Sequence, residues 1–261
     1  MIDTHSHIYA EEFDSDRNEA LERAWSAGIE ALILPDIDSE SRERMIALAE
    51  QHPDRCYAMA GLHPTSVNDN PRWREELDMV EQMLQHSPVK LCGVGEIGLD
   101  LYWSEEYYRE QREALHSQIE MALQYNYPVV IHTRSAYKEM IDAIETYRGR
   151  GLRGVFHAWA DSAETARKLE RLGEFKFGIG GVVTFKNSGL DKVVAELPVE
   201  LLLLETDCPY LTPVPYRGKR NESAYVERVV TRLAEVYQLS PEEVAEQTSR
   251  TASALFFGHE S

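Results

Sequence analysis

Short apolar segments alternate along the chain with longer stretches in which apolar and charged residues follow a helical period. The apolar segments are five to eight residues long, rich in Leu, Ile and Val, and mostly lack alternating polar positions. This pattern is typical of strands buried on both faces. We predict eight strands on this basis, over residues 1–8, 31–35, 56–62, 90–97, 128–132, 152–157, 175–179 and 199–205.

The charge-rich stretches between these segments predict amphipathic helices. In the longest, residues 104–126, Leu115, Ile119 and Leu123 recur at helical spacing among Glu, Arg and Gln. Another helix is predicted to begin at Ser240, which is followed by a proline and, three residues after the cap, by Glu243.

The alternation of eight strands with helices predicts parallel βαβ units, because parallel neighbours need a crossover connection. We therefore predict an α/β fold of the (β/α)₈ barrel class. A doubly wound open sheet, the main alternative, usually carries a glycine-rich phosphate turn that this sequence lacks. The length of 261 residues suits one such barrel and no linker-like segment divides the chain, so we expect a single domain over residues 1–261.

Composition and charge exclude several classes of protein. With 43% hydrophobic residues the chain is too apolar to be disordered, and no stretch approaches the roughly 18 apolar residues of a membrane span. The N-terminus shows no signal peptide and the three cysteines are widely spaced, so we expect a cytoplasmic protein. The net charge of −18 argues against a protein that coats DNA, but not against an enzyme acting on one phosphodiester. The polar helices favour a monomer.

Residues with metal-binding chemistry follow several predicted strands, at the end where barrel enzymes assemble their active sites. His5 and His7 are two residues apart, so both imidazoles project to the same side of an extended strand. Two neutral imidazoles on one side can chelate a divalent metal. For this pair alone, solvated N-terminal histidines are an equal alternative.

Further candidate metal ligands lie at the ends of later predicted strands. Glu96 is a carboxylate whose burial without a cation would be costly, and His132 and His157 each directly follow an apolar segment. Asp207 is expected at the mouth of the barrel, where it could bind metal and take a proton from water. Glu205 lies one layer deeper, where an internal hydrogen-bonding role is at least as well supported as a ligand role.

Six candidate ligands result: His5, His7, Glu96, His132, His157 and Asp207. Four nitrogens and two carboxylates are too many for one tetrahedral ion with an open position. They suit two divalent cations bridged by a carboxylate and a solvent oxygen. Histidine ligands suit Zn²⁺, Mn²⁺ or Ni²⁺, whereas Mg²⁺ normally prefers oxygen, so the identity stays open among these cations.

Taken in order, the motifs resemble the TatD family of metal-dependent deoxyribonucleases, (β/α)₈ barrels of the amidohydrolase superfamily. The resemblance runs from residue 2 to about residue 257 and rests on Asp3-Thr4-His5-x-His7, Gly61-x-His63-Pro64, Gly95-Glu96-Ile97-Gly98-Leu99-Asp100, His132-x-Arg134, His157 and Glu205-Thr206-Asp207-x-Pro209. It implies that the six residues are metal ligands, that Glu96 bridges the ions, and that His63 contacts the substrate phosphate.

The resemblance implies a metal-dependent hydrolase of phosphodiester bonds, foremost a 3′-end exonuclease on single-stranded DNA. Asp207 would orient the attacking water and act as general base. Arg134 is a candidate contact for substrate charge; so is the cluster of Arg217, Lys219 and Arg220, for which a solvated loop is an equal alternative. Two other functions stay open: hydrolysis of another ester, such as a D-aminoacyl-tRNA or a small phosphoester, and metal binding without turnover.

Differences from the family bear on substrate choice. His157 is followed by Ala158-Trp159 where members commonly carry Phe-Ser-Gly one residue on, Ile8-Tyr9 replaces a Leu-Asp pair, and Ser223 replaces a proline. Related cyclic-amide hydrolases often bridge two metals with a carboxylated lysine on the fourth strand. Here Lys90 lies at the wrong end of that segment, which favours the phosphoesterase branch over dihydroorotase-like chemistry.

Overall fold

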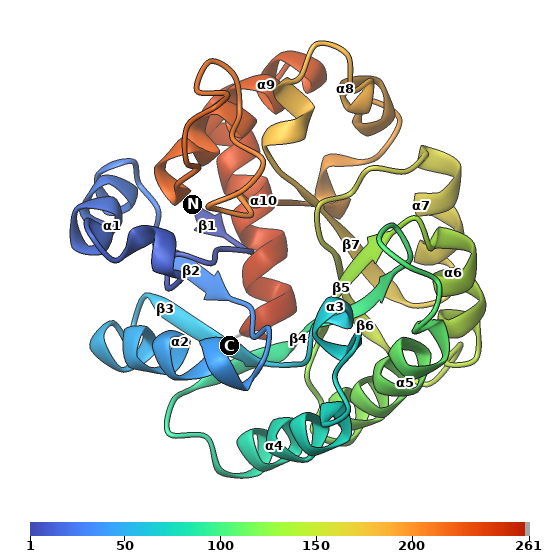
Figure 1. Cartoon of the computed structure of the whole chain (residues 1–261). Coiled ribbons are helices and arrows are strands. Elements are labelled where there is room, and N and C mark those ends of the chain that lie inside the picture. The colour runs from blue at the N-terminus through green and yellow to red at the C-terminus, as the bar shows by residue number, and fades with distance from the viewer. Residues whose placement is uncertain (259–261) are drawn as a thin grey trace.

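Eight parallel strands lie side by side in the order in which they occur in the sequence, with helices around them (Figure 1). This computed structural model describes residues 1–258. The strands are β1 (Ile2–Asp3), β2 (Ala31–Leu34), β3 (Cys56–Ala60), β4 (Leu91–Asp100), β5 (Val129–Arg134), β6 (Arg153–Phe156), β7 (Glu174–Ile179) and β8 (Leu202–Leu204).

Ten α-helices occur within residues 1–258 and surround the strands (Figure 1). They are α1 (Arg17–Ser26), α2 (Ser39–Gln51), α3 (Pro64–Val67), α4 (Trp73–His86), α5 (Tyr108–Gln124), α6 (Tyr137–Glu145), α7 (Ala163–Glu170), α8 (Leu190–Val194), α9 (Val226–Tyr237) and α10 (Pro241–Phe256). None of these helices is long and apolar enough to cross a membrane.

Backbone hydrogen bonds join the last strand to the first and make the sheet a barrel. Thr4 donates to the carbonyl of Leu204 at 2.9 Å, and Asp207 donates to the carbonyl of His5 at 2.9 Å. An isolated parallel bridge between Ser6 and Cys208 continues this seam. The (β/α)₈ barrel predicted from the sequence is therefore confirmed.

Several predicted boundaries are wrong. The first strand was expected over residues 1–8 but ends at Asp3, because the backbone beyond it bonds alternately to both neighbours: Ser6 donates to Ile33 and His7 to Cys208. Residues 199–201 form a 3₁₀ turn before β8 rather than part of it. The fourth strand continues three residues past the expected end, to Asp100.

The long helix predicted over residues 104–126 is α5, which is shorter at both ends. Before it, the hydroxyl of Ser104 accepts the backbone N–H of Glu106 at 3.0 Å, a local bond that favours a turn over a helix. After it, Asn126 has a left-handed φ of 58°, which ends the helical path. The predicted start of α10 is confirmed, since Ser240 and Glu243 form a reciprocal capping box.

Apolar side chains of the strands fill the interior of the barrel, and α10 closes one end of it. Ile33, Met59 and Leu203 point into the barrel and form one apolar cluster with Leu255 and Phe256 near the end of α10. A second, larger cluster packs the outer faces of the strands against the helices. Because α10 covers the end at which the strands begin, the opposite end is left to carry the site.

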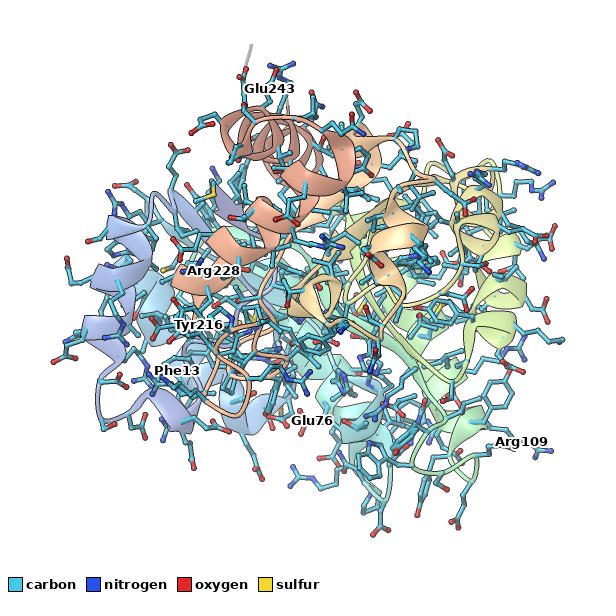
Figure 2. The ribbon with its side chains drawn as sticks, turned by 90° about the horizontal axis from the view of Figure 1, so that it is seen from above. Phe13, Glu76, Arg109, Tyr216, Arg228 and Glu243 are labelled. Atoms are coloured by element: carbon cyan, nitrogen blue, oxygen red, sulfur yellow. The ribbon has the colours of Figure 1, made fainter. Side chains whose placement is uncertain are left out.

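Charged side chains cover the outside of the helices. Arg109 and Glu243, labelled in Figure 2, both extend from the surface, while α9 turns Val226, Val229 and Leu233 towards the core. This separation of apolar and charged faces is the helical pattern that the sequence predicts.

Candidate metal centre

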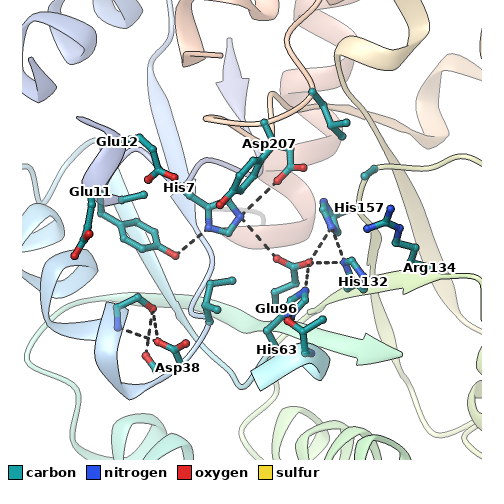
Figure 3. Close-up of a pocket in the computed structure, with 18 of the residues that line it drawn as sticks. His7, Glu11, Glu12, Asp38, His63, Glu96, His132, Arg134, His157 and Asp207 are labelled. Atoms are coloured by element: carbon teal, nitrogen blue, oxygen red, sulfur yellow. Dashed lines mark hydrogen bonds and ion pairs between the residues drawn. The ribbon is translucent and has the colours of Figure 1, made fainter. Parts of the chain in front are cut away.

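The six candidate ligands lie together at the carboxyl ends of the strands. Figure 3 shows five of them, all except His5, around the pocket. One oxygen of Glu96 is 3.0 Å from Nε2 of His5, and the other is 2.9 Å from Nε2 of His157 and 3.0 Å from Nδ1 of His132. Glu96 is 2% exposed, so its charge is balanced by these imidazoles rather than by solvent.

A second group of donors shares His5. The Nε2 atoms of His5 and His7 are 3.2 Å apart, and Oδ1 of Asp207 lies 3.8 Å from the first and 3.5 Å from the second. The predicted projection of His5 and His7 to one side is therefore found in the structure, although the regular strand ends before them.

The spacing and chemistry of these donors fit divalent cations. A tetrahedral zinc with bonds of about 2.1 Å holds its donors about 3.4 Å apart. The His5–His7–Asp207 triangle has sides of 3.2, 3.5 and 3.8 Å. Glu96 has one oxygen directed at His5 and the other at His157, so its carboxylate lies between two groups of nitrogens.

The electrostatics of the cluster also favour cations. Burial alone would raise the pKa of Glu96, but the surrounding imidazoles, His157 first, hold the pKa well below its ordinary value. Burial alone would lower the pKa of His157, yet Glu96 raises it to about 10, so a positive charge is favoured beside Glu96. Burial lowers the pKa of His5 to about 4, which keeps its lone pair available for a metal.

Tyr9 fixes which nitrogen of His7 faces the cluster. The Tyr9 hydroxyl donates its only hydrogen to the carbonyl of Pro35. Its contact of 3.0 Å with Nδ1 of His7 is then a bond in which His7 donates. Neutral His7 therefore carries its hydrogen on Nδ1 and directs the bare Nε2 towards His5 and Asp207.

Asp100 determines which nitrogen of His132 faces the cluster, as Tyr9 does for His7. Its Oδ2 lies 3.0 Å from Nε2 of His132 and leaves Nδ1 directed at Glu96. A carboxylate on the far nitrogen is the usual partner of a metal-binding histidine. This role of Asp100 was not predicted from the sequence, although Asp100, like Glu96, is a carboxylate at the end of an apolar segment, and that position is the signal that indicates Glu96.

His63 also reaches Glu96, since its Nε2 lies 3.2 Å from Oε1 of that carboxylate. In His63, however, the ring hydrogen lies on Nε2, whereas in His7 it lies on Nδ1. The backbone N–H of Thr65 donates to Nδ1 of His63 at 3.2 Å, so neutral His63 carries its hydrogen on Nε2. This nitrogen is a hydrogen-bond donor aimed into the pocket. His63 is thus better suited to an oxygen of a substrate than to a metal.

Glu205 lies behind His157 rather than among the candidate ligands. Its Oε1 accepts the backbone N–H of Ala158 at 2.6 Å and lies 3.8 Å from Nδ1 of His157. Burial raises the pKa of Glu205 to about 8. A Cβ on Gly178 would collide with this carboxyl group, so the glycine is what admits Glu205 here.

The backbone around Asp207 is held in an uncommon conformation. Asp207 has a φ of 56°, in the left-handed region that is unfavourable for residues other than glycine. Its neighbour Thr206 donates its backbone N–H to Oδ1 of Asp3 at 3.0 Å and its hydroxyl to Oδ2 at 2.7 Å. These bonds fix the segment that carries Asp207 to the first strand.

The cluster opens into a pocket of about 1060 Å³ at the mouth of the barrel. Arg134 lines this pocket, and its predicted contact with substrate charge stays a prediction. Arg217, Lys219 and Arg220 do not line it, and Arg220 instead pairs with Asp16 at 2.6 Å. The alternative reading of this cluster, as part of a loop, fits the structure better.

The differences from the family motifs lie mostly behind the pocket wall. Trp159 is buried, and the Ser223 hydroxyl lies 3.0 Å from the hydroxyl of Ser6. Ala158 and Tyr9 are the differences that line the pocket. Lys90 precedes β4, with its ammonium 5.7 Å from the ring centre of Tyr57, far along the strand from the cluster.

Comparison with known proteins agrees with the architecture and the motifs. The family model described as TatD related DNase matches residues 2–257. The uncharacterized metal-dependent hydrolase YabD of Bacillus subtilis is 36% identical over 257 residues, covering 98% of both chains. The 3'-5' ssDNA/RNA exonuclease TatD of Erwinia tasmaniensis is 28% identical over 98% of this chain and 99% of its own.

Among solved structures, the TatD homologue YjjV of Escherichia coli superposes with a TM-score of 0.91 at 31% identity, covering 98% of both chains. A hydrolase of the TatD family from Entamoeba histolytica has the same fold, with a TM-score of 0.83 at 19% identity over 99% of this chain and 98% of its own. The match to the family model spans nearly the whole chain, and more than one relative exceeds 30% identity. This protein belongs to the TatD family of metal-dependent hydrolases.

Proposed function

We propose that the protein hydrolyses phosphodiester bonds at the 3′ ends of single-stranded DNA, with two divalent cations held by His5, His7, Glu96, His132, His157 and Asp207. The observation that carries this proposal is the pairing of two kinds of group in one pocket. Imidazole nitrogens and carboxylate oxygens of the kind that bind cations surround Glu96, and the Nε2–H of His63 lies beside them. A phosphodiester needs both, because it carries negative charge and accepts hydrogen bonds.

When bound, such cations polarise a phosphoryl oxygen and lower the pKa of a coordinated water towards neutrality. The protein's own groups orient the reactants around them. Glu96 has both oxygens engaged by nitrogens on opposite sides, which makes it the proposed bridge between the two cation positions.

Asp207 is the proposed general base. Its Oδ1 faces the Nε2 atoms of His5 and His7, and the side chain is 14% exposed at the edge of the pocket. An attacking water held there can pass a proton to the carboxylate. The hydrogen bonds that hold the backbone of residues 206–207 keep this carboxylate in place.

His63 and Arg134 are the proposed contacts to substrate. The Nε2–H of His63 would donate to a non-bridging phosphate oxygen, and Arg134 would supply positive charge at the rim. Both line the pocket, and His63 is held by Thr65 in the donor form. A hydrogen bond to a charged group contributes about 1.5–3 kcal/mol, enough to matter for both binding and turnover.

The test is hydrolysis by the purified protein of three substrates with added Mn²⁺ or Zn²⁺: a labelled single-stranded oligonucleotide, a D-aminoacyl-tRNA and a chromogenic phosphodiester. We expect single nucleotides to be released from the 3′ end of the oligonucleotide and no activity after chelation. Turnover of the D-aminoacyl-tRNA alone would assign the same residues to a carboxylic ester. Turnover of none of the three would contradict the proposal.

A further inference from the structure

Two large aromatic side chains stand exposed beside the pocket without any role in the proposed chemistry. Tyr102 is 56% exposed and Trp103 is 69% exposed. By contrast, Trp73 and Trp159 are 4% and 1% exposed. Both exposed rings belong to the short segment between β4 and α5, at the same end of the barrel as the candidate metal centre.

These rings form one unit with Arg134. The guanidinium carbon of Arg134 lies 3.7 Å from the ring centre of Tyr102 and 5.3 Å from that of Trp103. The two rings contact each other edge to face, with centres 4.9 Å apart. Since Arg134 itself lines the pocket, the group of Tyr102, Trp103 and Arg134, here called the aromatic platform, adjoins the pocket directly.

The aromatic platform is tied to the candidate metal centre by a single carboxylate. Oδ1 of Asp100 accepts the backbone N–H of Tyr102 at 3.0 Å, while Oδ2 lies 3.0 Å from His132. The backbone N–H of Leu101 also donates to the carbonyl of Arg134 at 3.0 Å. The platform therefore has a fixed place relative to His132 and Glu96.

Charge around the pocket favours this side for a polyanion. Glu11, Glu12 and Asp38 line the opposite side of the pocket, across from Arg134 (Figure 3). Arg44, the arginine that lines the acidic side of the pocket, is already paired with Asp14 and Glu11. A strand with its scissile phosphate at Glu96 would be repelled by the acidic side and would leave the pocket over Arg134.

We propose that the aromatic platform stacks an unpaired nucleobase of the substrate strand, with Arg134 between the stacked base and the phosphate at the metal centre. This inference rests on the proposed function and adds the recognition of the base. Exposed aromatic faces next to positive charge are how single strands are bound without sequence preference. Bases inside a duplex do not expose their faces, so the platform selects single-stranded ends.

The test separates base recognition from cleavage. Binding of a fluorescent single-stranded thymidine oligonucleotide, and of an abasic strand of the same length, is measured by anisotropy in EDTA, where the strand stays intact. The quantity compared is the ratio of the two dissociation constants. Cleavage of the base-bearing strand is measured separately with Mn²⁺.

We expect the wild-type protein to bind the base-bearing strand more tightly, and Trp103→Leu to reduce the ratio by about 10-fold. Trp103→Phe should keep most of the ratio because a ring remains, yet lose the quenching of tryptophan fluorescence on binding. Trp25→Leu is the matched control, since Trp25 also lies under an arginine, Arg55, at 4.8 Å, but does not line the pocket.

The outcomes distinguish the failure of the aromatic platform from the failure of the proposed function. An unchanged ratio in Trp103→Leu, or equal binding of both strands by the wild-type protein, would overturn the aromatic platform even if cleavage is normal. A wild-type protein that binds with base dependence but cleaves no strand would overturn the proposed function and leave the platform standing. A protein that neither binds nor cleaves the strand would overturn both.

Discussion

At the scale of single residues, the position of one hydrogen on each imidazole decides what that imidazole can bind. His7 and His63 are chemically identical and both face the same pocket. Tyr9 holds the hydrogen of His7 on Nδ1, whereas the backbone of Thr65 leaves that of His63 on Nε2. The first therefore presents a lone pair and the second a donor. The partners behind each ring thus distinguish the two proposed roles, metal ligation for His7 and substrate contact for His63.

The role proposed for Asp207 predicts a specific kinetic defect. Asn has nearly the same shape and offers one oxygen to a metal, but it cannot accept a proton. Asp207→Asn should therefore retain at least one cation and lower kcat by about 10²–10⁴-fold, with little change in KM. Steady-state kinetics and metal analysis check both parts.

A matched substitution, Asp54→Asn, removes an exposed carboxylate just before β3, at the other end of the barrel, and should leave kcat unchanged. Wild-type kcat in Asp207→Asn would make Asp207 an ordinary carboxylate at the mouth of the barrel and remove the proposed base.

His63 should prove important for substrate and not for metal content. His63→Ala removes a donor to a charged oxygen, so kcat/KM on phosphodiesters should fall about 10- to 100-fold while the number of bound cations stays the same. His86→Ala, an exposed change at the end of α4, is the control. Loss of a cation from His63→Ala would place His63 among the metal ligands.

At the scale of secondary-structure elements, the order and number of strands could be predicted because each buried parallel strand is a continuous apolar segment. The residues at which strands end could not be predicted in this way. The first strand stops at Asp3 because Ser6 and His7 bond to different neighbours, which no local pattern reveals. The pairings of Asp100 with His132 and of Tyr9 with His7 likewise depend on the registers of neighbouring strands and loops. The candidate ligands were predictable as residues, and their partners were not.

One ion pair links elements distant in sequence and predicts a pH dependence of stability. Asp16, before α1, accepts two bonds from Arg220, at 2.6 and 2.8 Å, and these lower the pKa of Asp16 to about 2. A depressed pKa means that the charged carboxylate stabilises the fold. The stabilisation is complete above the unfolded pKa of about 4 and is lost as the pH falls towards 2.

Asp16→Asn should therefore lower the free energy of unfolding by about 1 kcal/mol at pH 7, the upper range for a partly exposed pair, and by progressively less below pH 4. Denaturant unfolding at several pH values measures the difference. Asp142→Asn, which removes a largely exposed ion pair with Lys138, should have almost no effect. A difference for Asp16→Asn that is constant from pH 7 to pH 2 would show that the charge contributes nothing.

At the scale of the whole molecule, negative charge and the candidate metal centre act together. The chain has 45 acidic and 27 basic residues, a net charge of −18. Such a molecule attracts divalent cations from solution and repels a polyanion over most of its surface. The proposed nucleic-acid substrate would then have to be guided locally, by bound cations, by His63 and by the side of the pocket that carries Arg134. A strand that reaches the centre only by one side would arrive in one orientation, which would suit the proposed action at strand ends.

Cations that bind only the folded barrel should stabilise it as a whole. At 100 times its dissociation constant a cation adds about 2.7 kcal/mol, which for a protein of this size raises Tm by roughly 5–10 °C. Thermal unfolding with Mn²⁺ or Zn²⁺ and with EDTA measures the shift, and EDTA should also abolish hydrolysis. His132→Ala and His157→Ala should fold, bind less metal and show a smaller shift, because each removes a nitrogen beside Glu96. His86→Ala should keep the full shift. If either variant retained two cations and full activity, the assignment of two cations to this cluster would be wrong.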